Sequence, residues 1–107
     1  MFYIKIHYIK NTENSIILAM CDESLIESIL EEDDIYIDIK TYADFYKGEL
    51  VNNKNKVLEI LEGMKIGSAN VVGKESIDTA INLKIIEKSN IKYVNNIPYA
   101  HAYYVKQ

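Results

Sequence analysis

The sequence contains no arginine and no tryptophan, and only one cysteine and one proline among its 107 residues. Because Cys21 is the single cysteine, a disulfide within the chain is excluded, and a cytosolic location is favoured. Without arginine the chain lacks the planar guanidinium that makes bidentate contacts to phosphate and guanine, so we expect no DNA-binding function.

Long apolar segments are also absent. The longest uninterrupted apolar run covers residues 16–21, whereas a membrane-spanning helix needs about 20 such residues. The first ten residues mix lysines with apolar residues and lack the basic-then-apolar order of a signal peptide. We therefore expect neither a membrane partner nor export.

Charge is unevenly distributed along the chain, whose net charge is −4 at pH 7. Residues 1–39 contain two lysines and nine acidic residues, whereas residues 40–107 contain ten lysines and seven acidic residues. The acidic part is compatible with a docking face, with a divalent-cation site, or with solvated helix ends and loops. The excess of lysine in the remainder leaves association with RNA or the ribosome open.

Alternation and apolar runs predict the strands. With 49% hydrophobic residues, the chain can form one packed domain over residues 1–107. Polar and apolar residues alternate over 2–10 and 35–39, while the segment 15–21, apolar on both faces, is typical of a central strand. Residues 11–14 have turn composition, so the chain is expected to open with a hairpin. Further extended segments are predicted over 66–72, 91–94 and 97–106, with a turn at Asn95–Asn96 and with Pro98 marking an edge or a strand entrance.

Helical spacing and capping residues predict about three short helices. Ser24 and Glu27 form a capping box before a helix over 24–32. A second helix follows Asn53 and ends at Gly63, and a third covers residues 74–83. One helical turn is predicted over 41–46, stopped by a left-handed Gly48. Together these elements predict an α+β domain with a mostly antiparallel or mixed sheet of four to five strands.

The junction before the third helix is the most informative stretch. Within residues 66–81, a run of small residues leads into Gly73, and a corner at Asn70 to Lys74 can present free backbone N–H groups to an anion, with Lys74 adding positive charge. It can equally be an ordinary strand-to-helix turn. The phosphate-binding loop GxxxxGK[ST] is not matched, because five residues separate Gly67 from Gly73 and Glu75 replaces the magnesium-binding hydroxyl. Nucleotide hydrolysis is therefore not expected, and looser anion binding stays open.

Cys21 and Asp22 end the predicted central strand. A nucleophilic thiolate needs a basic neighbour, and Asp22 has the opposite effect, so Cys21 is interpreted as a core residue and Asp22 as a supplementary helix cap. His7, Cys21, Asp22 and His101 have none of the local spacings of a metal site. No metal, cofactor or catalytic residue is assigned.

The last predicted strand carries a row of rings. Alternation places Tyr99, His101 and Tyr103 on one face, and the small Ala100 and Ala102 on the face that a helix can approach closely. The rings can form a stacking platform for bases or a ligand, or they can be cross-strand packing partners. His101 could also act as a general base, although no partner for it is visible.

Five blocks of sequence then suggest a family. The blocks are LAMCDESL at 18–25, FYKGELV at 45–51, ANVVG at 69–73, SIDTAI at 76–81 and IPYAHA at 97–102. Similar blocks occur in the same order in the archaeal domain of unknown function 424 family, which nearly the whole chain resembles. The resemblance implies an intracellular archaeal protein of one domain and implies no activity.

Two departures from the family pattern concern single positions. Lys84 occupies the place of a glycine that usually follows the third helix. Tyr99 and Ala100 separate His101 from the proline that the family's histidine usually follows directly, so no role is transferred to His101.

The sequence therefore predicts a small cytosolic binding or adaptor module without catalysis, whose most favoured partner is another protein. Two alternatives remain: association with RNA or the ribosome, and binding of a small molecule or phosphate ligand, with or without catalysis, at Gly73–Lys74. The candidate contact residues are Cys21, Asp22, Asn70, Gly73, Lys74 and His101.

Overall fold

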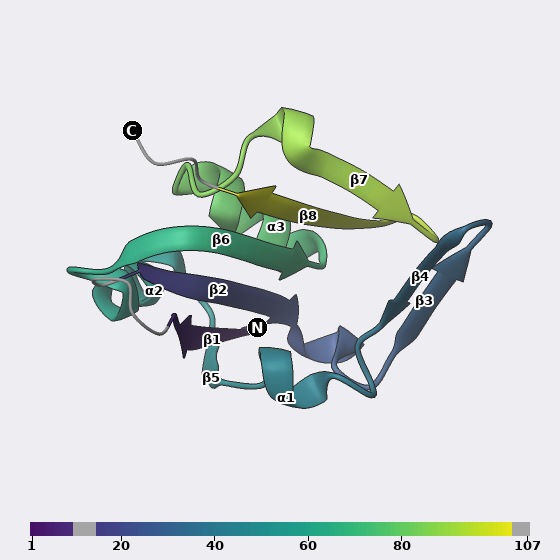
Figure 1. Cartoon of the computed structure of the whole chain (residues 1–107), viewed down its shortest axis with the longest axis horizontal. Coiled ribbons are helices and arrows are strands. Elements are labelled where there is room, and N and C mark those ends of the chain that lie inside the picture. The colour runs from purple at the N-terminus through teal and green to yellow at the C-terminus, as the bar shows by residue number, and fades with distance from the viewer. Residues whose placement is uncertain (10–14, 104–107) are drawn as a thin grey trace.

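The computed structural model describes residues 1–9 and 15–103. Its main sheet has six strands in the order β5-β1-β2-β6-β8-β7 (Figure 1). β2 and β6 run parallel and the other neighbours run antiparallel, so the sheet is mixed. The α+β class is confirmed, but the prediction of four to five strands is wrong. The strands are β1 (Phe2–Tyr8), β2 (Ser15–Asp22), β5 (Glu49–Val51), β6 (Lys65–Val72), β7 (Ile91–Val94) and β8 (Ile97–Tyr103).

The predicted opening hairpin and its central strand are confirmed. β1 pairs with β2 from Phe2 opposite Asp22 to Tyr8 opposite Ile16. β2 lies between β1 and β6, and the four consecutive residues from Leu18 to Cys21, together with Ile16, have no exposed surface. This burial on both faces explains the apolar composition of residues 16–21. The turn predicted over residues 11–14 lies outside the described residues.

The helix predicted over residues 24–32 is wrong. A short 3-10 turn, η1 (Glu23–Leu25), is followed by β3 (Ile29–Glu32), which pairs with β4 (Ile35–Asp38) as a separate two-stranded sheet. The Ser24–Glu27 capping box is not formed, since η1 has no side-chain cap. Ile29 is exposed and Leu30 is buried, as strand alternation requires, and Asp33 turns the hairpin with a φ of 53°. The apolar spacing of residues 25–30 is compatible with a helix or a strand, and the pairing of β3 with β4 makes residues 29–32 a strand.

Residues 1–9 and 15–103 contain three α-helices: α1 (Ala43–Tyr46), α2 (Lys54–Leu61) and α3 (Lys74–Asn82). The α2 cap is as predicted, because the Asn53 side chain accepts from Lys56 N at 2.9 Å and Gly63 follows the helix with a φ of 77°. Gly48 does not adopt the predicted left-handed conformation. It is instead required for close approach, because a Cβ there would overlap the Ile4 carbonyl of β1. Among the described residues, no helix is long and apolar enough to cross a membrane.

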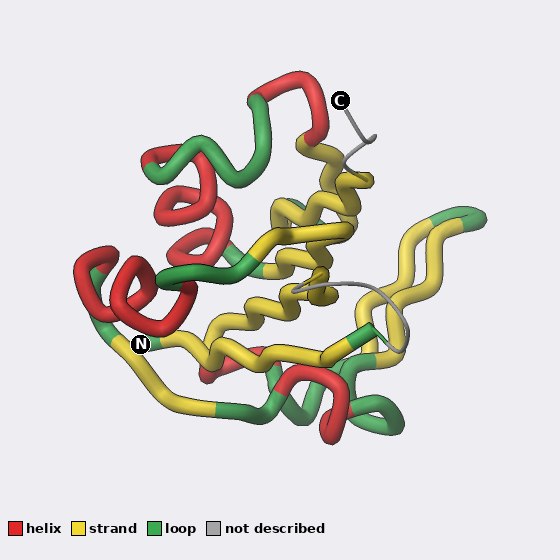
Figure 2. Tube along the Cα trace, turned by 60° about the vertical axis from the view of Figure 1, so that its left-hand side comes forward, coloured by secondary structure: helices red, strands yellow, loops and turns green. Residues whose placement is uncertain are grey.

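Two hydrophobic cores lie on opposite faces of the main sheet. Figure 2 shows α2 and α3 on one side of the sheet, where they enclose the larger core around Leu18, Met20 and Val71. The smaller core on the other face contains Cys21 and Val72 and is closed by the excursion, the contiguous segment 23–46 that contains η1, β3, β4 and α1. Part of this second face is left uncovered: His101 and Tyr103 of β8 are exposed there, whereas Tyr99 packs against the smaller core.

The turn between β7 and β8 is confirmed. Asn95 and Asn96 have φ angles of 50° and 65°, which is the pattern of a type I′ hairpin turn. Pro98 stands at the entrance of β8, as predicted, but not at an edge, because β8 lies between β6 and β7. The edge strand on this side of the sheet is β7, and the opposite edge strand is β5.

Lys84 ends α3 in the left-handed conformation, with a φ of 61°. Ile85 N donates to Ala80 O at 2.8 Å across this residue, so the glycine-type helix end is kept without glycine. We expect Lys84→Gly to raise the free energy of unfolding by about 1 kcal/mol, because a Cβ is disfavoured at positive φ. Urea denaturation followed by circular dichroism measures the change. Lys88→Gly is the control and should destabilise, since Lys88 has no positive φ; a loss of stability in both variants would contradict the argument.

Candidate functional site

The corner between β6 and α3 is closed by Asp22. Because β2 and β6 are parallel and end together, the Asp22 side chain reaches the first turn of α3. Its carboxylate accepts from Glu75 N at 3.1 Å, from Ser76 N at 2.8 Å and from the Ser76 hydroxyl at 2.8 Å. A negative charge thus already occupies the positive end of the helix dipole. The cap acts on α3, and not on the helix predicted directly after Asp22.

Gly73 is part of this closed corner. It is buried, its φ is 108°, and its N–H donates to Pro98 O at 2.8 Å. The expectation that the corner presents free amide hydrogens is wrong for Gly73, Glu75 and Ser76. Lys74 is exposed and forms no ion pair with another described residue. An anion at this helix end would have to displace Asp22.

Cys21 lies inside the smaller core with no exposed surface. Burial, followed by the charge of Asp22, raises the pKa of the Cys21 thiol to about 12. The side chain is therefore a neutral thiol at physiological pH, and it donates to the Asp22 carbonyl at 3.4 Å. This environment fits the interpretation as a core residue.

Asn70 and His101 are brought together on the partly uncovered face. They are directly opposite each other in the β6–β8 pair, and Asn70 is half-buried whereas His101 is exposed. The His101 ring lies 4.6 Å from the Tyr103 ring between centroids, at an interplanar angle of 44°. Of the six candidate residues, the structure thus joins Asp22, Gly73 and Lys74 at one corner, and Asn70 and His101 at a second place.

His7 is separate from both groups. Its ring stacks on Phe45 at 4.5 Å between centroids, and its Nε2 lies 2.7 Å from Phe45 O. Within residues 1–9 and 15–103, no three acidic, histidine or cysteine side chains are placed to hold a metal ion together.

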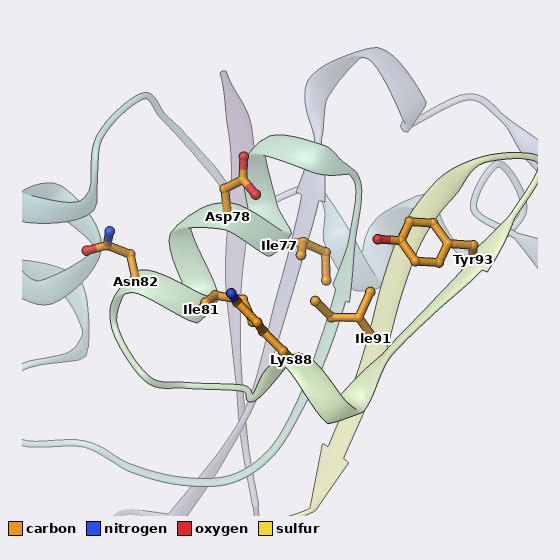
Figure 3. A pocket seen from close by; sticks show the side chains of 7 residues that line it. All are labelled: Ile77, Asp78, Ile81, Asn82, Lys88, Ile91 and Tyr93. Carbon is orange, nitrogen blue, oxygen red and sulfur yellow. The ribbon is translucent and has the colours of Figure 1, made fainter.

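A groove between α3 and β7 was missed by the sequence reasoning. Its volume is about 560 Å³, and Figure 3 shows the Ile91 and Tyr93 side chains directed from β7 toward α3. The lining combines three isoleucines with four polar side chains, and we call it the α3–β7 groove: Ile77, Ile81, Ile91, Asp78, Asn82, Lys88 and Tyr93. The helical spacing predicted that Ile77 and Ile81 face the core. It could not show that the sheet ends at β7, which leaves Ile81 only partly covered while Ile77 is buried at the base of the groove.

The free edge of β7 runs along this groove. Val94 and Ile97 flank the two-residue turn, so their backbone groups hydrogen-bond to each other. Hydrogen-bonded pairs alternate along an antiparallel ladder, so the backbone groups of Lys92 also point toward β8, where they meet Tyr99. The polar backbone groups of Tyr93, opposite Pro98, consequently point away from β8. The Ile91 carbonyl points the same way, whereas Ile91 N donates to Lys88 O. Tyr93 N–H has no backbone partner within the part of the chain that the structure describes.

Comparisons with known proteins give a family and a fold. A model of the family described as "Protein of unknown function (DUF424)" matches residues 9–105. A crystal structure of an uncharacterized conserved protein from Methanopyrus kandleri superposes with a TM-score of 0.68 at 19% sequence identity, covering 95% of this chain and 90% of that one. At this identity the likeness shows the fold alone. No curated protein matches the sequence significantly. The family match extends over nearly the whole chain, and the chain belongs to this DUF424 family.

Proposed function

We propose that the chain is a non-catalytic binding module that holds an extended segment of a partner protein along β7. The observation that carries this proposal is that the free edge of β7 lies beside the α3–β7 groove. A partner strand would pair with the outward groups of Tyr93 and with the Ile91 carbonyl. One of its apolar side chains would then enter the groove over Ile77. This is the mode of recognition in which main-chain hydrogen bonds give affinity and a pocket gives specificity.

Size and charge support this occupant. A volume of about 560 Å³ lies within the range of specific binding pockets and suits one large side chain with its neighbours. Lys88 lies at the groove and has no acidic partner among the described residues. An acidic residue next to the apolar residue of the partner segment would neutralise the charge of Lys88.

The environment of the candidate residues supports a function without catalysis. Cys21 is a buried thiol with a pKa of about 12, and Asp22 is engaged in three hydrogen bonds. Within the described residues, His101 contacts the Tyr103 ring and no carboxylate that could orient it as a base. A buried lone cysteine also supports the cytosolic location that we propose.

Photo-crosslinking in the native cell tests the site. A photoreactive phenylalanine analogue replaces Tyr93, which is 61% exposed at the groove, or Tyr8, which is 75% exposed elsewhere on the sheet. We expect position 93 to capture one partner segment, and mass spectrometry should identify an apolar residue adjacent to an acidic one. Position 8 should capture nothing in common with it.

A second pair of variants serves as the control. Ile81→Asp places a carboxylate in the groove and should reduce the yield at position 93 at least fivefold, whereas Asn55→Asp on the exposed side of α2 should not. Equal capture at positions 8 and 93, or capture of RNA alone, would refute the protein-binding proposal. Substrate turnover that disappears in His101→Ala would refute its non-catalytic part.

A further inference from the structure

A pocket distinct from the α3–β7 groove lies on the opposite face of the sheet. Its volume is about 170 Å³, and its floor is the paired backbone of β6 and β8 around Asn70 and His101. Ile37 of β4 and Tyr46 of α1 form the wall contributed by the excursion, and Tyr99 completes the lining. We call this the Asn70 pocket. Drug-sized ligands occupy about 300–1,000 Å³, so this pocket fits a single ring system and not a whole cofactor.

The Asn70 carboxamide lines this pocket and has no hydrogen-bond partner among the residues that the structure describes. Asn70 is half-buried, and its side chain makes no hydrogen bond with the other described residues. A carboxamide presents one acceptor and one donor side by side, which matches the amino group and ring nitrogen on one edge of adenine. The ligand that satisfies both atoms at once is therefore a flat ring with an adjacent donor and acceptor.

The remaining walls of the pocket are aromatic. Tyr46, Tyr99 and His101 each line it. Tyr46 is half-buried, and burial raises the pKa of its hydroxyl to about 12, so the ring is neutral at physiological pH. Beside the pocket, the His101 and Tyr103 rings lie 4.6 Å apart, and Tyr103 is 72% exposed. Exposed rings next to the pocket provide a stacking surface for a second base.

We infer that the Asn70 pocket binds an adenine-type nucleobase, with the Asn70 carboxamide contacting the base edge and the neighbouring rings contacting its faces. The inference is independent of the protein-binding proposal, because the two sites lie on opposite faces of the sheet. The same base chemistry is present in a free nucleotide and in single-stranded RNA, and binding measurements distinguish the two sources.

Fluorescence anisotropy and calorimetry with the purified full chain provide the test. The probes are AMP, UMP, and six-nucleotide oligoadenylate and oligouridylate, measured at low and at physiological salt. We expect the adenine probes to bind at least tenfold more tightly than the uracil probes. If oligoadenylate binds more tightly than AMP, RNA is the source; if both bind alike, a free nucleotide is the source, and either result supports the pocket.

Variants of asparagine separate the pocket from general attraction. Asn70→Ala and Asn70→Asp should both weaken adenine binding at least tenfold, because neither keeps the donor. Asn55→Ala on α2 should leave binding unchanged. Thermal unfolding of each variant without probe establishes that it is folded. The inference is overturned if no probe binds at low salt, if adenine and uracil bind alike, or if Asn70→Asp binds as the wild type does.

Discussion

Replacing Asp22 with alanine is expected to lower the free energy of unfolding by about 3 kcal/mol. Loss of a helix cap costs about 0.5–2 kcal/mol, and a buried polar group left without a partner costs about 1–3 kcal/mol more. Both costs apply here, since the Asp22 carboxylate accepts two amides of α3 and also the hydroxyl of Ser76, which has no exposed surface. Urea denaturation followed by circular dichroism measures the loss.

Two further variants identify the cause of this loss. Asp38→Ala removes an aspartate that accepts one exposed amide, from Thr41 at 2.8 Å, and should cost clearly less. Ser76→Ala combined with Asp22→Ala should cost less than the two single losses added together, because the double variant leaves no buried hydroxyl unpaired. If Asp22→Ala lowers the free energy of unfolding no more than Asp38→Ala does, the hydrogen bonds from Asp22 of β2 to α3 do not stabilise the fold.

Gly73→Ala is expected to lower the free energy of unfolding by at least about 3 kcal/mol. An alanine at a φ of 108° is strained, and its Cβ would overlap the Asp22 carboxylate. Backbone strain of this kind costs about 1–3 kcal/mol, and forcing extra volume into a packed site costs about as much again. The glycine is therefore required by the close approach of the cap, and the same denaturation experiment measures the effect.

Gly63→Ala is the matched control for Gly73→Ala. Gly63 also has a positive φ, 77°, but a Cβ there would meet no heavy atom within 4 Å, so about 1 kcal/mol is expected. Combining Gly73→Ala with Asp22→Ala should cost less than the sum, since the overlap disappears with the carboxylate. Equal losses of unfolding free energy in Gly63→Ala and Gly73→Ala would show that backbone strain alone, and not overlap with Asp22, is responsible. Additive losses in the variant that combines Gly73→Ala with Asp22→Ala would show the same.

Local chemistry in the sequence predicted much of the fold. The Asn53 cap, the Asn95–Asn96 turn and the apolar run of β2 each determine a structure within a few neighbouring residues, and each is confirmed. The errors lie where distant pairing decides. Residues 29–32 become a strand because β4 pairs with them, and β5 has only three residues, which are ordered by pairing with β1.

The candidate sites were predictable to different degrees. Asn70 and His101 were both identified, but their contact depends on the β6–β8 register, which no local pattern specifies. The closed corner at Gly73 was not predictable, because Asp22 is 51 residues away in the chain and reaches it through a parallel strand pair. The α3–β7 groove results from the position of β7 at the end of the sheet. The sequence of β7 itself does not indicate this position in the strand order.

The excursion that closes the smaller core has a consequence for local unfolding. The excursion is contiguous in sequence, and its two strands pair with each other and not with the six-stranded sheet. It can therefore detach while the six-stranded sheet, α2 and α3 stay folded. Detachment would uncover Cys21 and remove Ile37 and Tyr46 from the Asn70 pocket. A bound base would contact both the sheet and the excursion, and it would therefore raise the free energy of this local unfolding.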